Sequence, residues 1–142
     1  KPAIIDSNGT QCWHIMGKLH REGDNPAVIY PRGDRSWYRN GNLYREDWWG
    51  NQSWFKEGFD RVKHREGDLP AFIGPDGSQK WYKDGKLHRE GDLPAVIDAD
   101  GEKCWYRFGK MHRDGNMPAI IKADGTKYWY VCGSVIYMRP TS

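Results

Sequence analysis

Long hydrophobic runs are absent from this 142-residue chain. No stretch approaches the ~20 consecutive apolar residues that a transmembrane helix needs, so we expect no membrane contact. Only 37% of the residues are apolar, and the mean hydropathy is −0.92. No segment has the 3.6-residue period of a long amphipathic helix. These absences disfavour a helical fold and an aliphatic interior, and they leave burial to the 8 Trp and 8 Tyr residues.

Cysteine is also scarce, with three residues in the chain. Cys12 and Cys104 precede a Trp at the same repeat position, four units apart. At two strands per unit this is roughly 38 Å, far beyond the ~7 Å Cα separation that a disulfide tolerates. Cys132 occupies a different position. We therefore expect three reduced thiols, in a cytoplasmic-type reducing compartment or a virion rather than in a secreted protein.

A large excess of one charge is missing as well. The net charge is +3, from 22 basic and 19 acidic residues. Acids and bases alternate inside a unit, as at Arg89, Glu90 and Asp92, which is typical of a solvated surface. Nucleic-acid binders usually carry a clear basic excess. Aromatic residues interleaved with Lys and Arg can nevertheless stack bases, so nucleic-acid binding stays open as the alternative function.

What the sequence has in abundance is one repeated unit of 24 residues. An aromatic pair marks each unit: Trp13-His14, Trp37-Tyr38, Trp54-Phe55, Trp81-Tyr82, Trp105-Tyr106 and Trp129-Tyr130. The spacings between these tryptophans are 24, 17, 27, 24 and 24 residues. A period of this length indicates that each unit buries its apolar side chains against its neighbours. We predict one repeat array over residues 1–142 with about six units, irregular at 44–64 and atypical at 126–142.

Several residue types recur in step with the tryptophans, and recurrence favours a structural role. The chain begins inside a unit and without Met, as expected of a fragment or a processed form. The residues predicted to build the repeat are Trp81, Tyr82, Gly85, His88, Arg89, Pro94, Trp105, Tyr106, Gly109, His112, Arg113 and Pro118.

Turn signals divide each unit into short strands. Asn40-Gly41 and Asp84-Gly85 are typical of type I′ hairpins, and Asp76-Gly77 predicts a second reversal. We predict an all-β fold, an elongated single antiparallel sheet of tandem β-hairpins that twists or curls. Two-residue loops at both turns would pair Tyr82 with Leu87, Lys83 with Lys86, Phe72 with Trp81 and Ile73 with Lys80. They would place Ala71, Ile73, Tyr82 and Leu87 on one face and Phe72, Trp81 and His88 on the other.

The segment from Asp76 to His88, Asp-Gly-Ser-Gln-Lys-Trp-Tyr-Lys-Asp-Gly-Lys-Leu-His, resembles the MORN repeat. More narrowly, Gly-Lys-Leu-His-Arg-Glu-Gly-Asp-Leu-Pro-Ala-Val-Ile at residues 85–97 is similar to the MORN-like variant of giant DNA viruses, phages and some bacteria. The likeness covers essentially the whole chain. In the usual MORN pattern a glycine separates two aromatic residues, whereas here the two aromatic residues, as in Trp81-Tyr82, are adjacent. The resemblance implies an extended hairpin sheet used for protein–protein contact or scaffolding.

The sequence offers little evidence for a catalytic or metal-binding site, because the residues that could form one recur with the repeat. His20, His64, His88 and His112 recur at the same repeat position, one unit or more apart. One unit is ~10 Å, which is too far for two of them to share a metal ion. No unit places a nucleophile beside a base, and no phosphate-binding glycine motif occurs. We therefore expect neither an enzyme nor a metal or cofactor site. A small-molecule or lipid site is a further alternative.

The irregular part of the array is the best candidate for a contact site. Between Glu46 and Gly50 the chain omits most of the Pro-Ala strand, and Asp47-Trp48-Trp49 has the pattern of an insertion. Residues 59–62 add three residues to a hairpin. Trp and Arg dominate binding hot spots, and the predicted partner-binding residues are Trp37, Trp48, Trp49, Trp54, Phe59 and Arg61. The alternative is repeat decay, with the tryptophans capping a kink in the sheet.

At the other irregular place, Ser134–Met138 stands where Lys-Leu-His-Arg-Glu is expected. This segment either caps the array or docks a partner. Together these patterns predict a non-enzymatic repeat scaffold that binds other proteins. The viral likeness sharpens that prediction to a virion structural or assembly component of the minor capsid or cement type, with capsid or other assembly proteins as partners. Self-association is a further open alternative.

Overall fold

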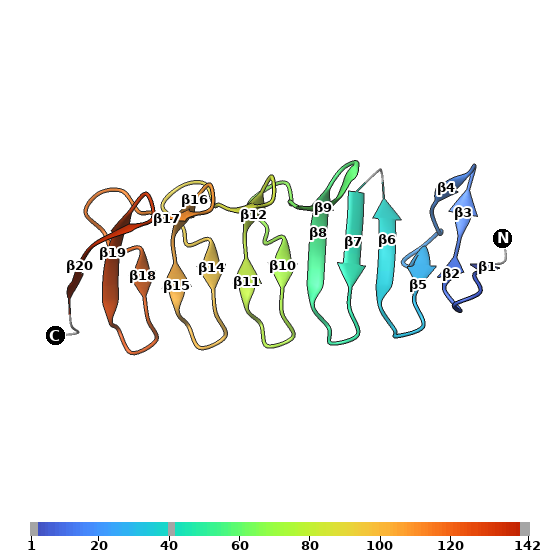
Figure 1. Cartoon of the computed structure of the whole chain (residues 1–142), viewed down its shortest axis with the longest axis horizontal. Helices are drawn as coiled ribbons and strands as arrows, with labels where there is room; N and C mark the ends of the chain where they lie inside the picture. Colours follow the sequence, from blue (N-terminus) through green and yellow to red (C-terminus); the bar gives the residue numbers. More distant parts are fainter. Residues whose placement is uncertain (1–2, 40–41, 140–142) are drawn as a thin grey trace.

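The computed structural model describes residues 3–39 and 42–139. In these ranges the chain forms β-strands and no helix, and hence no helix able to cross a membrane. Hydrogen-bonded neighbours are antiparallel throughout, and they follow one another in chain order along a long, narrow array (Figure 1). The predicted all-β fold, an open sheet of antiparallel hairpins, is confirmed.

One 14-stranded sheet runs the length of the array. Its strands are β1 (Ile4–Ile5), β2 (Gln11–Cys12), β5 (Val28–Ile29), β6 (Arg35–Arg39), β7 (Asn42–Glu46), β8 (Gln52–Lys56), β9 (Phe59–Lys63), β10 (Phe72–Ile73), β11 (Gln79–Lys80), β14 (Val96–Ile97), β15 (Lys103–Cys104), β18 (Ile120–Ile121), β19 (Lys127–Val131) and β20 (Ser134–Arg139). Strand β9 pairs only with β8, off the main path. A regular unit contributes two short strands to this sheet.

The second hairpin of each regular unit separates from the main sheet. These hairpins are β3 (His14–Ile15) with β4 (Lys18–Leu19), β12 (Tyr82–Lys83) with β13 (Lys86–Leu87), and β16 (Tyr106–Arg107) with β17 (Lys110–Met111). The separation occurs at the tryptophan. The Trp81 N–H donates to the Ala95 carbonyl at 2.8 Å, in the main sheet, whereas the Trp81 carbonyl accepts the His88 N–H at 3.1 Å, in the hairpin. Each tryptophan is thus where the chain changes its pairing partner.

The hairpin turn at Asp84-Gly85 is the type I′ turn that the sequence predicts. Both residues have positive φ, 49° and 80°, and the pairs Tyr82–Leu87 and Lys83–Lys86 form as expected. The other predicted turn of this type, Asn40-Gly41, lies outside the described residues.

The second reversal has a three-residue loop, and the two-residue loop predicted from Asp76-Gly77 is wrong. The Gly74 N–H donates to the Ser78 carbonyl at 2.9 Å, and the Gly77 N–H donates to the Gly74 carbonyl at 3.0 Å. Gly77 has φ 88°, the left-handed conformation that closes such a loop with one extra residue.

This extra residue shifts the strand register by one. Phe72 pairs with Lys80 and Ile73 with Gln79, so neither Phe72–Trp81 nor Ile73–Lys80 forms. A one-residue slip exchanges the faces of a strand. Ala71 and Ile73 therefore share a face with Trp81, not with Tyr82, and the predicted division of the faces is corrected.

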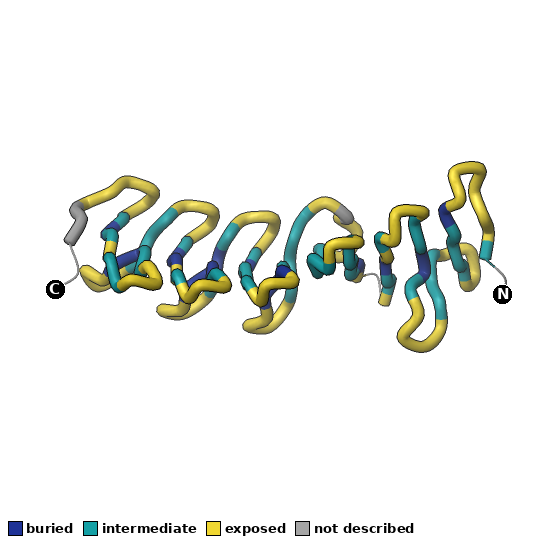
Figure 2. Tube along the Cα trace, turned by 90° about the horizontal axis from the view of Figure 1, so that it is seen from below, coloured by how far each residue is buried: buried dark blue, intermediate teal, exposed yellow. Residues whose placement is uncertain are grey.

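The core is a row of side chains rather than an interior. Alanines alternate with tryptophans across the sheet: Ala71, Ala95 and Ala119 are 0% exposed, and Trp81, Trp105 and Trp129 are 6–7% exposed. Buried positions follow one another along the axis of the array, with exposed turns on either side (Figure 2). The small alanine leaves room for a covering segment over each pair of rings.

Candidate functional site

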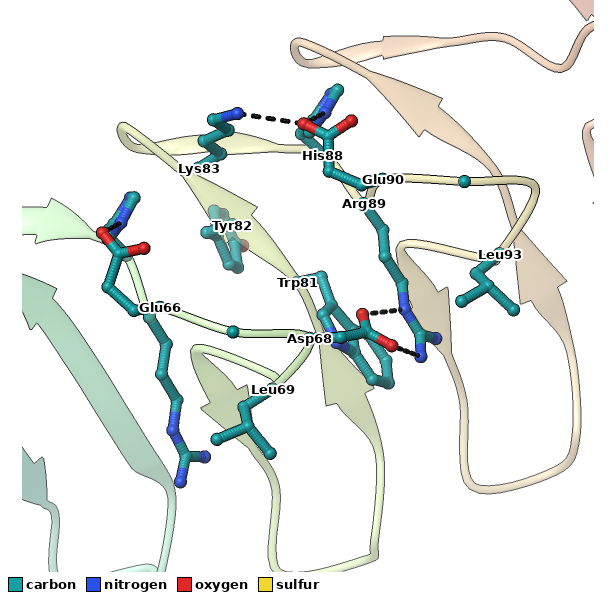
Figure 3. A pocket seen from close by; sticks show the side chains of 14 residues that line it. Glu66, Asp68, Leu69, Trp81, Tyr82, Lys83, His88, Arg89, Glu90 and Leu93 are labelled. Carbon is teal, nitrogen blue, oxygen red and sulfur yellow. Dashed lines mark hydrogen bonds and ion pairs between the residues drawn. The ribbon is translucent and has the colours of Figure 1, made fainter.

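A covering segment crosses the tryptophan face in each regular unit. We call it an arch; the four arches span residues 20–26, 64–70, 88–94 and 112–118. Figure 3 shows two successive arches on either side of Trp81. The hollows between neighbouring regular arches measure about 480 Å³ and about 440 Å³.

An arginine holds each regular arch in place. The Arg89 guanidinium lies 3.8 Å from the centre of the Trp81 ring and donates to the Pro94 carbonyl at 3.1 Å. It also donates from Nε and Nη2 to both oxygens of Asp68, in the preceding arch, at 2.7 and 2.8 Å (Figure 3). These hydrogen bonds lower the pKa of the Asp68 carboxyl. Arginine thus ties its own tryptophan to the neighbouring arch.

The recurring histidines join one unit to the next. The Nδ1 atom of His88 accepts the Phe108 N–H at 3.1 Å, its Nε2 atom lies 3.0 Å from Glu90, and its ring stacks on Phe108 at 4.2 Å. Because Nδ1 accepts, Nε2 carries the proton and donates to the carboxylate. Among the described residues no group of three or more His, Cys, Asp or Glu side chains could hold a metal ion. These contacts give the histidines a structural role.

The three cysteines are free thiols. Cys104 is buried, and its burial together with the nearby Glu102 carboxylate raises its pKa to about 12. A thiol with this pKa is protonated at neutral pH and is a poor nucleophile.

The interruption is a deletion of seven residues, the difference between the 24- and 17-residue spacings. The Asp47 N–H donates to the Asn51 carbonyl at 3.0 Å and the Gly50 N–H to the Asp47 carbonyl at 2.9 Å, the pattern of the regular turn at 98–102. Asp47-Trp48-Trp49 therefore belongs to an ordinary hairpin loop, and its prediction as an insertion is wrong. What is missing between Glu46 and Asp47 corresponds to residues 91–97, the end of an arch and its Pro-Ala strand.

Strand β7 replaces the missing Pro-Ala strand in the main sheet but not the missing arch. It continues straight from the hairpin into the main sheet, pairing with β6 on one side and β8 on the other. Tyr44 then occupies an alanine position of the core row, with its ring centre 4.9 Å from that of Trp37 and 4.8 Å from that of Trp54. Arg45 lies over Phe55 at 5.5 Å, on the opposite face. No arch follows Tyr44.

The aromatic row at the interruption is therefore partly open. Trp37, Tyr44 and Trp54 are half-buried, unlike the buried Trp81 and Trp105. Two depressions of about 520 Å³ and about 530 Å³ adjoin there and share Trp54 and Asn42. We call them the open groove, and its defining residues are Trp37, Asn42, Tyr44, Trp54 and Arg65.

The six predicted contact residues lie in three places. Trp37 and Trp54 line the open groove. Trp48 and Trp49 stack on each other at 4.3 Å in the loop between β7 and β8, at the edge of the sheet opposite the β8–β9 hairpin (Figure 1). They are 51% and 62% exposed.

Phe59 and Arg61 lie in β9, where both are exposed. The three added residues produce a register shift in this hairpin, with pairs Phe55–Lys63 and Lys56–Phe59.

Sequence reasoning missed three of the five residues that define the groove, Asn42, Tyr44 and Arg65. Tyr44 stands where regular units have His, and Arg65 belongs to the repeated His-Arg step, whose recurrence favours a structural role. The signal that could have found them is the alignment of residues 44–54 on 88–105, which shows the seven-residue gap directly.

The fold and the site define a class: an open antiparallel sheet of arch-covered units, in which the unit of Trp37 lacks its arch. No protein-family profile matches this chain, and no curated protein matches it in sequence.

Proposed function

We propose that this chain is a non-enzymatic repeat scaffold that binds a protein partner in the open groove. The observation that carries the proposal is the row Trp37–Tyr44–Trp54, which has lost the arch that covers its regular counterparts. Aromatic side chains in a partly desolvated hollow are typical binding hot spots. An uncovered aromatic surface of this kind marks an interaction site in a soluble protein.

The arrangement of charges favours a protein over a nucleic acid. Many cations of the array already have an acidic partner, as in the pairs Arg89–Asp68, Arg113–Asp92 and Lys56–Asp84. Phosphate groups would have to displace these carboxylates, whereas a protein surface of mixed charge would not. A structural or assembly role in a virion is a narrower proposal, and it rests on the repeat resemblance alone.

Capture from the native source after nuclease treatment tests the proposal. The key variant, which we call the arch-restored variant, carries a copy of residues 91–97 between Glu46 and Asp47. Its restored arch should cover the groove and abolish capture of the partner. The matched control, Trp48→Ala with Trp49→Ala, alters exposed aromatic residues outside the groove and should retain capture. Equal capture by all three chains, or recovery of nucleic acid alone when nuclease is omitted, would reject the proposal.

A further inference from the structure

The arches follow one rule of charge pairing: the carboxylate comes from the preceding arch. Asp68 pairs with Arg89 and Asp92 with Arg113, each through two hydrogen bonds of 2.7–2.9 Å. The fourth arch carries Asn116 at this position, and the sequence has no arginine 21 residues later, since residue 137 is Tyr. An arch therefore carries Asp at this position when an arginine lies 21 residues later in the sequence, and Asn when it does not.

Arg65 has lost its acid because the preceding arch is the deleted one. It keeps the other contacts of its counterparts: it lies 3.8 Å from the centre of the Trp54 ring and donates to the Pro70 carbonyl at 3.1 Å. Among the described residues it forms no ion pair within 4.0 Å. Burial lowers the pKa of the Arg65 guanidinium, which is the direction expected for a cation whose partner is missing. A partly buried charge without its partner is costly.

Asp24, the acid of the first arch, does not fill this vacancy. Its carboxylate pairs with Arg39 on the far side of the groove and is 97% exposed. The arginine that would follow it, Arg45, has moved to the opposite face of the sheet. Of the two guanidinium groups that line the groove, Arg39 is paired with Asp24, and Arg65 has no carboxylate partner among the described residues. Arg65 is held beside the aromatic row by stacking and by a backbone hydrogen bond.

We infer that the occupant of the open groove is an extended acidic segment of the partner protein, whose carboxylate binds Arg65 as Asp68 binds Arg89. This inference rests on the proposed function and names the chemistry of its ligand. In the regular arch the acid is followed by an apolar residue and proline, Asp68-Leu69-Pro70. The partner segment should likewise place an apolar residue after its acid, where it can contact Trp54 and Tyr44.

The test uses a synthetic peptide with the sequence of residues 88–97, which contains one complete arch. It is added to the full chain, and the Arg65 Nε–H resonance is followed by NMR. Wild-type peptide should shift this resonance, and the peptide with Asp92→Asn should bind about tenfold more weakly, because a charge-assisted pair becomes a neutral hydrogen bond. Glu90 is present in both peptides, so the comparison isolates the one carboxylate.

Two chain variants complete the test. Arg65→Gln should weaken binding of the wild-type peptide about tenfold, while Arg113→Gln, which loses an equivalent stack on Trp105, should not. The peptide comparison is independent of whether Arg65→Gln folds. Equal affinity of the Asp and Asn peptides would overturn the acidic-segment inference. Failure of every peptide to bind, with partner capture still lost in the arch-restored variant, would overturn the inference and leave the proposed function standing. If no peptide binds and the arch-restored variant still captures the partner, both the acidic-segment inference and the proposed function would be overturned.

Discussion

The regular units and the interrupted unit share one sheet but differ in what covers it. At Trp81 and Trp105 an arch crosses the rings, alanine lies between them, and arginine joins the arch to its neighbour. Between Trp37 and Trp54 the arch is missing, and Tyr44 fills the alanine position. A seven-residue deletion preserves strand pairing because β7 replaces two strands by one. Covering and pairing are therefore separable properties of this repeat.

The largest expected difference between the two regions is in the cost of removing a tryptophan. Trp105→Ala should lower the free energy of unfolding by about 3–5 kcal/mol, because the side chain is 7% exposed in the core row. Trp37→Ala should cost about half as much, since its ring is only half-buried. Urea denaturation followed by circular dichroism measures both. Equal losses would mean that the interruption is as well covered as a regular unit.

The second-largest expected difference between the two regions is in the stability effect of substitutions at the alanine position of the core row, which is Ala95 in a regular unit and Tyr44 at the interruption. Ala95→Leu should destabilise the protein by about 1–3 kcal/mol, because Ala95 is 0% exposed beneath an arch and has no room for a larger side chain. Tyr44→Leu removes two ring contacts and should cost about 1–2 kcal/mol, through lost contacts rather than through crowding.

Substitution by phenylalanine at each position distinguishes lost ring contacts from crowding. Tyr44→Phe keeps both ring contacts and loses the 3.3 Å hydrogen bond from the Tyr44 hydroxyl to Glu46, so it should cost less than Tyr44→Leu in thermal unfolding. Ala95→Phe should instead be worse than Ala95→Leu. The opposite order at position 95 would contradict the close packing of the arch.

Acid titration distinguishes the paired arginines from Arg65. The pKa of Asp92 is lowered by its hydrogen bonds from Arg113. Its contribution is therefore complete above its unfolded pKa of about 3.9 and is lost as pH falls through the lower folded value. Asp92→Asn should cost about 0.5–1 kcal/mol at pH 7, a modest amount because the carboxylate side chain is 63% exposed. In urea titrations this difference should diminish as pH falls below about 3.9 and through the lower folded pKa of Asp92.

Arg65→Gln provides the contrast. Since Arg65 has no carboxylate partner among the described residues, the stability difference between this variant and wild type should not depend on Asp protonation. A loss of that difference between pH 5 and pH 2, parallel to that of Asp92→Asn, would reveal an acid paired with Arg65.

The smallest expected effect belongs to the exposed tryptophans. Trp48→Ala with Trp49→Ala should change the free energy of unfolding by less than about 1 kcal/mol, because both side chains are more than half exposed and stack on each other. Peptide binding in the open groove should be unchanged. A large loss of stability would place these residues in the core of the array.

The repeat period and turn residues were enough to predict the all-β array and the Asp84-Gly85 hairpin. The register of the other turn was not predictable from Asp76-Gly77 alone, because two- and three-residue loops both use Asp-Gly, and they place opposite faces of the strand together. Tryptophan density directs the sequence-based hypothesis to the interrupted unit, where the structure brings Trp37 and Trp54 together beside Tyr44. Tyr44 and Arg65 were missed because their significance depends on a segment that the sequence lacks.

The most direct test of the account compares the affinity of the captured partner for the wild-type chain and for the arch-restored variant by isothermal titration calorimetry. If the missing arch creates the binding site, the restored arch should occupy the groove and weaken binding by at least about tenfold, with the fold retained by circular dichroism. Unchanged affinity for a folded arch-restored variant would contradict the account and place the contact elsewhere on the array.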